Sequence, residues 1–215
     1  KSMEAYVQLA PGQSCIVQCG ARGDTDWTYL RAKAPGEMLT GRWDVSFIKG
    51  GPGLPAAVQL SRLQSWTEVG GEEGKAFSGT AKYTLEFPKP QMAAEVWRLD
   101  LGRVAESARV VVNGKDLGTL IAAPFAIDIP ADKLRDLNTL EVFVSNLMAN
   151  RIADMDRRDM AWKRFYNVNM AALEPANRGA NNIFSAAKWE PRESGLIGPV
   201  TLTPMEKFNP ASPNS

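Results

Sequence analysis

The sequence contains no histidine among its 215 residues. Histidine is the commonest general base in enzymes and the commonest side-chain ligand of protein-bound metal ions. Its absence excludes Ser-His-Asp and Cys-His catalytic sites, and histidine-based zinc sites, within this chain. Any acid–base chemistry would have to use carboxylates, lysine or tyrosine.

The sequence also lacks an excess of charge of either sign, because 25 Lys and Arg residues balance 24 Asp and Glu residues to a net charge of +1. This balance does not indicate a nucleic-acid partner. No run approaches the roughly 18 apolar residues that are needed to cross a bilayer. We therefore expect neither nucleic acid nor membrane as a partner.

Cysteine is scarce, with only Cys15 and Cys19, which lie in an apolar, β-like run. Residues four apart on a strand share a face but lie about 13 Å apart. Since a disulfide needs Cα atoms within about 7 Å, we expect two free, largely buried thiols.

The chain begins at Lys1 without the apolar run of a signal peptide. We interpret this start as a fragment boundary, and we expect the parent protein to be periplasmic or secreted.

Alternation of apolar and polar residues, broken by turn residues, predicts a series of strands without long helices between them. This pattern indicates an all-β sandwich or barrel rather than a parallel α/β sheet. The expected strands are Arg42–Ile48, Phe77–Phe87, Val96–Leu101, Ala108–Val112, Asp116–Ile121, Pro124–Ile129, Thr139–Asn146 and Gly198–Thr203.

Several turn residues support this series. Asn113-Gly114 between two apolar runs predicts a tight hairpin, because a type I′ turn needs positive φ twice. We expect Gly79 and Gly118 where a side chain would clash or a strand must bend. Asn138 is expected to start the next strand, and residues 131–137 to form a helical turn.

The two ends of the chain differ from this centre. In residues 1–40 we expect two short strands, 4–9 and 14–19, and then a linker over 20–40, as the remnant of a preceding domain. Residues 41–206 are expected to form the sandwich together with a long, partly irregular tail, and residues 207–215 a frayed end. The tail is predicted to be ordered because it carries large aromatic residues.

Two sets of short segments carry a family resemblance. The first set is 63–67, 77–83, 99–104, 108–114, 117–118, 124–125, 138–142 and 146–147, and the second is 146–152, 162–167 and 194–200. The first set, in this order between residues 41 and 146, resembles the galactose-binding-like jelly roll of sugar-acting hydrolases, as in family 2 glycosidases. The second set resembles the C-terminal end of family 106 α-L-rhamnosidases.

In the family 106 enzymes the chemistry resides in a separate (β/α)8 barrel that lies upstream. The resemblance therefore implies a non-catalytic, carbohydrate-binding or scaffolding module of a bacterial glycoside hydrolase that acts in polysaccharide degradation. Its partners would be a plant or bacterial polysaccharide and the catalytic domain of the same polypeptide. The alternative is an autonomous carbohydrate-binding protein, and a complete small hydrolase is disfavoured.

Aromatic residues are the first candidates for a sugar site, because sugar rings pack their apolar faces on Trp and Tyr. Trp162, Tyr166 and Trp189 lie in the tail, where they either hold the tail in place or line a sugar-facing surface. Arg151 is either a carboxylate clamp or a structural salt bridge. Trp66 and Trp97 are expected to pack in the core or against a hairpin.

Carboxylates are the second candidates. Asp154, Asp156 and Asp159 alternate with arginines, which indicates an ion-pair network. The alternative is a calcium site built on Asp154 and Asp156, since several oxygens in a loop suit this cation. Glu72-Glu73 is expected in a solvated loop.

Overall fold

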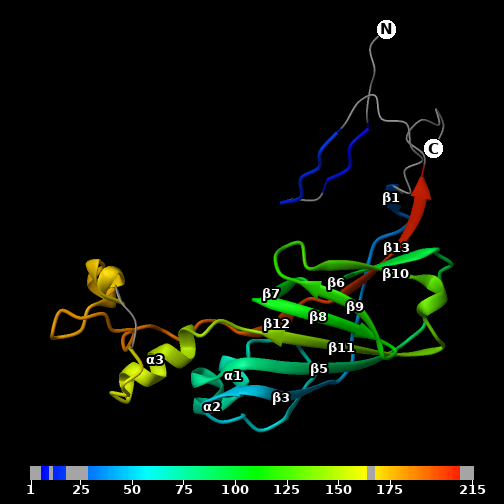
Figure 1. The fold of residues 1–215 in the computed structure, drawn as a ribbon. Helices are drawn as coiled ribbons and strands as arrows, with labels where there is room; N and C mark the ends of the chain where they lie inside the picture. The colour runs from blue at the N-terminus through cyan, green and yellow to red at the C-terminus, as the bar shows by residue number, and fades with distance from the viewer. Residues whose placement is uncertain (1–5, 10–11, 18–28, 164–167, 209–215) are drawn as a thin grey trace.

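Two antiparallel sheets stack face to face over an apolar core in the computed structural model (Figure 1), which describes residues 6–9, 12–17, 29–163 and 168–208. This arrangement confirms the predicted all-β sandwich. Of the helices in the described residues, none is long and apolar enough to span a membrane.

The first sheet has five strands in the order β1-β13-β6-β10, with β2 also paired to β13. Its strands are β1 (Tyr29–Ala32), β2 (Glu37–Met38), β6 (Val96–Asp100), β10 (Ala126–Pro130) and β13 (Thr201–Phe208). The second sheet has six strands in the order β4-β3-β5-β11-β8-β9. Its strands are β3 (Trp43–Gly51), β4 (Val58–Leu60), β5 (Ser78–Pro88), β8 (Ser107–Val112), β9 (Lys115–Leu120) and β11 (Leu137–Ser145).

A small third sheet pairs β7 (Arg103–Ala105) with β12 (Gly195–Gly198). The helices are short and lie at one end of the sandwich or in its connections. They are α1 (Trp66–Val69), α2 (Gly71–Ala76), α3 (Ala149–Arg157) and the 3₁₀ turns η1 (Ala131–Lys133), η2 (Val168–Leu173) and η3 (Pro175–Asn177).

Strand β5 shows why the sequence forms a sandwich. Every second residue from Ala81 to Phe87 is buried in the core, while the residues between them lie on the outer face. Trp66 and Trp97 are also buried, at 1% and 4% exposure, which confirms their predicted core positions. Trp66 packs edge-on against Phe77 with ring centroids 5.6 Å apart.

The predicted turn chemistry is confirmed. Asn113 and Gly114 both have positive φ, 52° and 79°, between the paired strands β8 and β9. A Cβ on Gly79 would lie 2.1 Å from the Lys49 carbonyl oxygen, and Gly118 has φ of 127° beside a strand irregularity. The buried Asn138 side chain accepts from the Arg135 amide and donates to the Arg135 carbonyl, each at 2.8 Å.

The predicted linker over residues 20–40 is wrong for its second half, because β1 and β2 both belong to the first sheet. The expected frayed end at residue 207 is also corrected, since β13 continues to Phe208 and pairs there with Tyr29. The residues of β1 and β2 show little hydrophobic alternation, because both strands are short and partly exposed. Glu72-Glu73, expected in a loop, lies in helix α2.

The predicted strands 4–9 and 14–19 are not formed in their described parts, 6–9 and 14–17. Side chains hold the first part instead: the Gln8 amide group bonds the Leu30 backbone, and the Tyr29 hydroxyl donates to the Tyr6 carbonyl. Without a packed strand face, Cys15 is exposed, so the predicted burial of its thiol is wrong, although it is free as expected. Cys19 lies outside the described residues.

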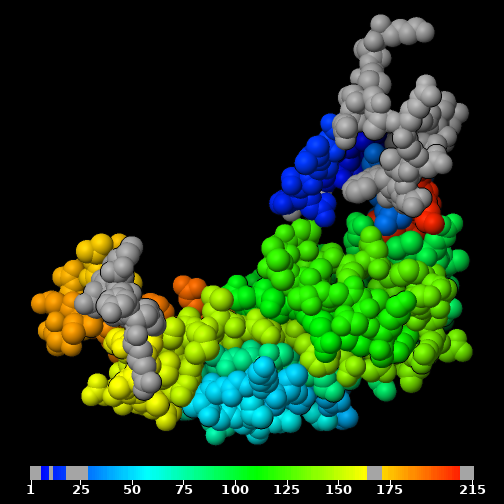
Figure 2. All heavy atoms as spheres, in the orientation of Figure 1, coloured from blue at the N-terminus to red at the C-terminus, as the bar shows by residue number. Residues whose placement is uncertain are grey.

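The tail divides into two structural parts. Its last residues form β12 and β13 within the sandwich, whereas residues 149–163 and 168–191, here called the tail lobe, extend to one side of it (Figure 1, Figure 2). The lobe has a small core of its own, made by Ala153, Ala172, Phe184 and Ala186 with Ile152, Trp162 and Trp189 around it. The tail joins the sandwich through its C-terminal strands and through helix α3, which contacts α2 and β5.

Candidate functional site

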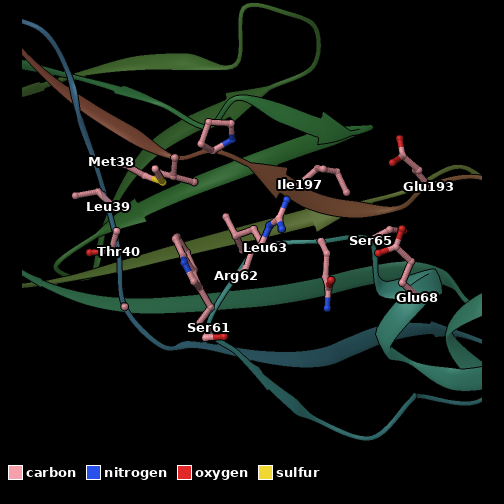
Figure 3. A pocket seen from close by; sticks show the side chains of 15 residues that line it. Met38, Leu39, Thr40, Ser61, Arg62, Leu63, Ser65, Glu68, Glu193 and Ile197 are labelled. Carbon is pink, nitrogen blue, oxygen red and sulfur yellow. The ribbon is translucent and has the colours of Figure 1, made fainter.

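A groove of about 650 Å³ lies between strand β2 and the end of β12 on one side and the start of β3 and the connection that follows β4 on the other. This volume is within the range that small ligands occupy. Figure 3 shows side chains from both sheets that converge on it. The lining residues are Met38, Leu39, Thr40, Gly41, Trp43, Ser61, Arg62, Leu63, Gln64, Ser65, Glu68, Glu193, Ile197, Pro199 and Val200.

The N-terminal cap of helix α1 helps to form one wall of the groove. Ser65 precedes helix α1, and its hydroxyl oxygen accepts from the Thr67 amide at 3.2 Å. The same oxygen accepts from the Ser194 amide at 3.0 Å, and the Trp66 amide donates to the Ser194 carbonyl at 3.0 Å. This pairing ties the start of α1 to the chain before β12, and so brings Glu68 and Glu193 to the same end of the groove (Figure 3).

A buried polar network holds this end of the groove against the sandwich. The Asn146 amide nitrogen donates to the Phe77 carbonyl and to Ser194 Oγ, each at 3.0 Å. Asn150 pairs with the Arg192 backbone through both its oxygen, at 2.8 Å, and its nitrogen, at 2.9 Å. Because buried polar groups are costly when unpaired, these bonds fix where the tail lobe leaves and rejoins the sandwich.

The groove combines apolar walls with a few polar groups. Leu39, Leu63 and Ile197 supply hydrocarbon surface, and the polar side chains come from Thr40, Ser61, Arg62, Gln64, Glu68 and Glu193. Glu193 forms an ion pair with Arg103. Within the part of the chain that the structure describes, no ion pair is formed by Arg62, which is exposed. The groove can therefore offer hydroxyl-binding groups, a carboxylate and a guanidinium to a ligand.

Of the predicted sugar-binding residues, Trp162, Trp189 and Arg151 do not line this groove. Trp162 and Trp189 pack around Phe184 in the tail lobe, with ring centroids 6.2 and 5.8 Å from it. The Trp189 indole donates to Asn177 Oδ1 at 2.7 Å, while Tyr166 is outside the described residues. Arg151 donates to Asp154 at 2.7 Å on helix α3. The sugar-binding role of these four residues stays a prediction.

The predicted metal ligands are engaged by cationic and N–H groups. Asp154 forms ion pairs with Arg151 and Arg158, at 2.7 and 2.8 Å. Asp156 pairs with Lys163 at 2.8 Å. No group of three or more acidic or cysteine side chains is placed to share a metal ion within residues 6–9, 12–17, 29–163 and 168–208. Calcium binding at Asp154 and Asp156 likewise stays a prediction.

The Asp156 carboxylate contacts several donor groups within the tail lobe. Its two oxygens accept from the Trp162 indole and the Ala186 amide, each at 2.7 Å, in addition to Lys163. Burial alone would raise the pKa of the Asp156 carboxyl, but the hydrogen bonds from Lys163, Ala186 and Trp162 outweigh burial and lower the pKa below its usual value.

This lowered pKa predicts acid sensitivity of the tail lobe. The ionised carboxylate stabilises the lobe fully above the unfolded pKa of about 4, and the contribution is lost as the pH falls through the lower folded pKa. Asp156→Asn should weaken the lobe at pH 7 by about 1–3 kcal/mol and reduce its loss of stability in acid. Hydrogen exchange of the Ala186 amide between pH 7 and about pH 3 measures both effects.

Asp159→Asn provides the matched control, since Asp159 is exposed and has φ of 53°, which asparagine tolerates. Equal amide protection of Ala186 in the two variants at pH 7 would contradict the role of Asp156.

The groove was not predicted from the sequence, although a signal for part of it exists. Ser65-Trp66-Thr67-Glu68 has the spacing of a capping box, which places a serine and a glutamate at a helix start. No local sequence motif identifies Arg62 or Glu193 as groove residues. They come together only because the fold joins segments more than 120 residues apart.

Comparisons with known proteins relate this chain to glycoside hydrolases. No model of a known protein family matches the chain. It is 36% identical over 178 residues to a protein of Formosa agariphila named "Putative beta-glucuronidase", a match over 77% of this chain and 15% of that protein. The solved structure of a rhamnosidase from Novosphingobium sp. PP1Y has 32% identity and a TM-score of 0.59, and the match covers 86% of this chain and 16% of that one. The chain thus spans about one seventh of the relatives it matches, and it is a glycoside-hydrolase-related domain.

Proposed function

We propose that this chain is a non-catalytic accessory domain of a longer, α-L-rhamnosidase-like glycoside hydrolase that degrades polysaccharide. It holds carbohydrate or supports the catalytic domain of the same polypeptide, and the parent acts in the periplasm or outside the cell. The galactose-binding-like type of sandwich belongs to this proposal.

One observation carries the proposal: similarity extends over most of this chain but over only 15% and 16% of the two relatives. Most of each relative therefore lies outside the matched domain and is available to carry the hydrolytic site. The groove adds chemical support, because apolar walls with hydroxyl-binding groups suit a sugar ring.

The proposal predicts that the purified 215-residue chain does not hydrolyse aryl rhamnosides or aryl glucuronides above the buffer rate. Glycoside hydrolysis usually needs two carboxylates about 5–9.5 Å apart. Glu68 and Glu193 are the carboxylates that line the groove, so they are the pair to test, although Glu193 is bound by Arg103. Release of the aryl group, followed by absorbance, is the measurement. Turnover that Glu68→Gln or Glu193→Gln abolishes would show that the chain is itself a hydrolase.

A further inference from the structure

We propose that the groove binds a uronic-acid-containing saccharide, with the sugar carboxylate on Arg62. This inference rests on the proposed carbohydrate-related function and deepens it by naming the class of ligand.

Arg62 is the observation from which the inference starts. It lines the groove, and it makes no ion pair in the described residues, whereas Arg103, Arg151 and Arg158 each bind a carboxylate of the chain. A guanidinium group presents parallel N–H donors that match the two oxygens of a carboxylate. The groove therefore holds a carboxylate-binding group that the described chain leaves for a ligand.

The distribution of charge along the groove sets the orientation of the ligand. In Figure 3, Arg62 lies in the middle part, near Leu63 and Ser61, whereas Glu68 and Glu193 both lie toward the right-hand end, on either side of β12. A ligand carboxylate would be attracted by Arg62 and repelled by the glutamates. Glu68 can only accept hydrogen bonds when ionised, so that end suits sugar hydroxyl donors.

The remaining walls suit a saccharide rather than a small inorganic anion. Leu39, Leu63 and Ile197 offer apolar surface to the C–H faces of a sugar ring, and Gln64 and Thr40 offer amide and hydroxyl groups. A volume of about 650 Å³ is far larger than a single inorganic anion requires. The combination favours an acidic sugar with at least one further ring.

Calorimetric titration tests the inference with the whole chain at low ionic strength, where charge pairing is least screened. The probes are digalacturonic acid, a glucuronic-acid-containing disaccharide and the methyl ester of each. An ester keeps the sugar scaffold and removes only the charge. At least one acid should bind about tenfold or more tightly than its ester, and salt should reduce this preference.

Variants locate the contact. Arg62→Gln should reduce the affinity for the acid about tenfold or more and leave the affinity for the ester nearly unchanged. Arg62→Lys should recover only part of the loss, because lysine keeps the charge but not the paired donors. Arg135→Gln is the matched control, since Arg135 is exposed and does not line the groove.

Equal affinity for acid and ester, no effect of Arg62→Gln, or no binding of any probe would overturn the inference. The proposed function fails by a different result, namely hydrolysis by the isolated chain. Binding of the esters alone would refute the acidic ligand and leave the accessory role standing.

Discussion

Replacing Gly195 by alanine is expected to destabilise the sandwich by about 3–6 kcal/mol, a large fraction of the roughly 5–15 kcal/mol by which a domain is ordinarily stable. Gly195 has φ of 106°, and a Cβ there would lie 2.2 Å from Tyr83 Oη and 2.9 Å from Trp66 Cε3. Both aromatic side chains are buried, at 0% and 1% exposure, so neither can move aside without opening the core. Urea unfolding followed by circular dichroism is the measurement.

Gly53→Ala is the control for this prediction. A Cβ on Gly53 would meet nothing within 4 Å, so the substitution should leave the free energy of unfolding nearly unchanged. Similar unfolding midpoints for the two variants would mean that the backbone at Gly195 relaxes freely, and that the contact between β12 and β5 is loose.

Truncation after Leu147 is expected to give an insoluble or molten product. It removes β13, which pairs with β1, β2 and β6 and contributes Leu202 and Met205 to the core. The first sheet would lose the strand that joins its other members, and apolar surface on both sheets would be exposed. Solubility, near-UV circular dichroism and dye binding report the result.

Replacing residues 158–187 by a Gly/Ser linker of about six residues should have a much smaller effect. The ends can be joined, because the Arg157 side chain bonds the carbonyl of the retained Trp189, and Asn150 pairs with Arg192 at the base of the lobe. The lobe core is separate from the sandwich core, so the melting temperature should fall by only a few degrees. A collapse of the folded state in this variant would show that the tail lobe is an integral part of the sandwich.

The central strands could be predicted because apolar and polar residues alternate strictly along them, as in β5. Turns such as Asn113-Gly114 could be predicted because the residues themselves favour positive φ. Strands β1 and β2 could not, since their place depends on pairing with β13 about 170 residues later. Local sequence contains no record of such a partner.

The groove could not be predicted for the same reason. The aromatic residues predicted a sugar site in the tail lobe, yet Trp162 and Trp189 pack around Phe184 there. The hydroxyl and charged groups of the groove come from three separated segments. Asp156 illustrates the reverse case. The alternating acidic and basic residues around Asp156 predicted ion pairs with the neighbouring arginines. The structure shows an ion pair between Asp156 and Lys163, which that pattern does not identify.

The position of β13 also orders the assembly of the molecule during synthesis. The six strands of the second sheet all lie between Trp43 and Ser145, so that sheet can form while the ribosome is still adding the tail. The first sheet draws on β1 at one end and β13 at the other, and it can close only after Phe208 has left the exit tunnel. Until then the inner face of the second sheet, with Tyr83, Leu85 and Val142, can be covered only by the incomplete first sheet of β6 and β10. The nascent chain therefore passes through a stage with a large exposed apolar surface, at which chaperone binding or aggregation competes with folding.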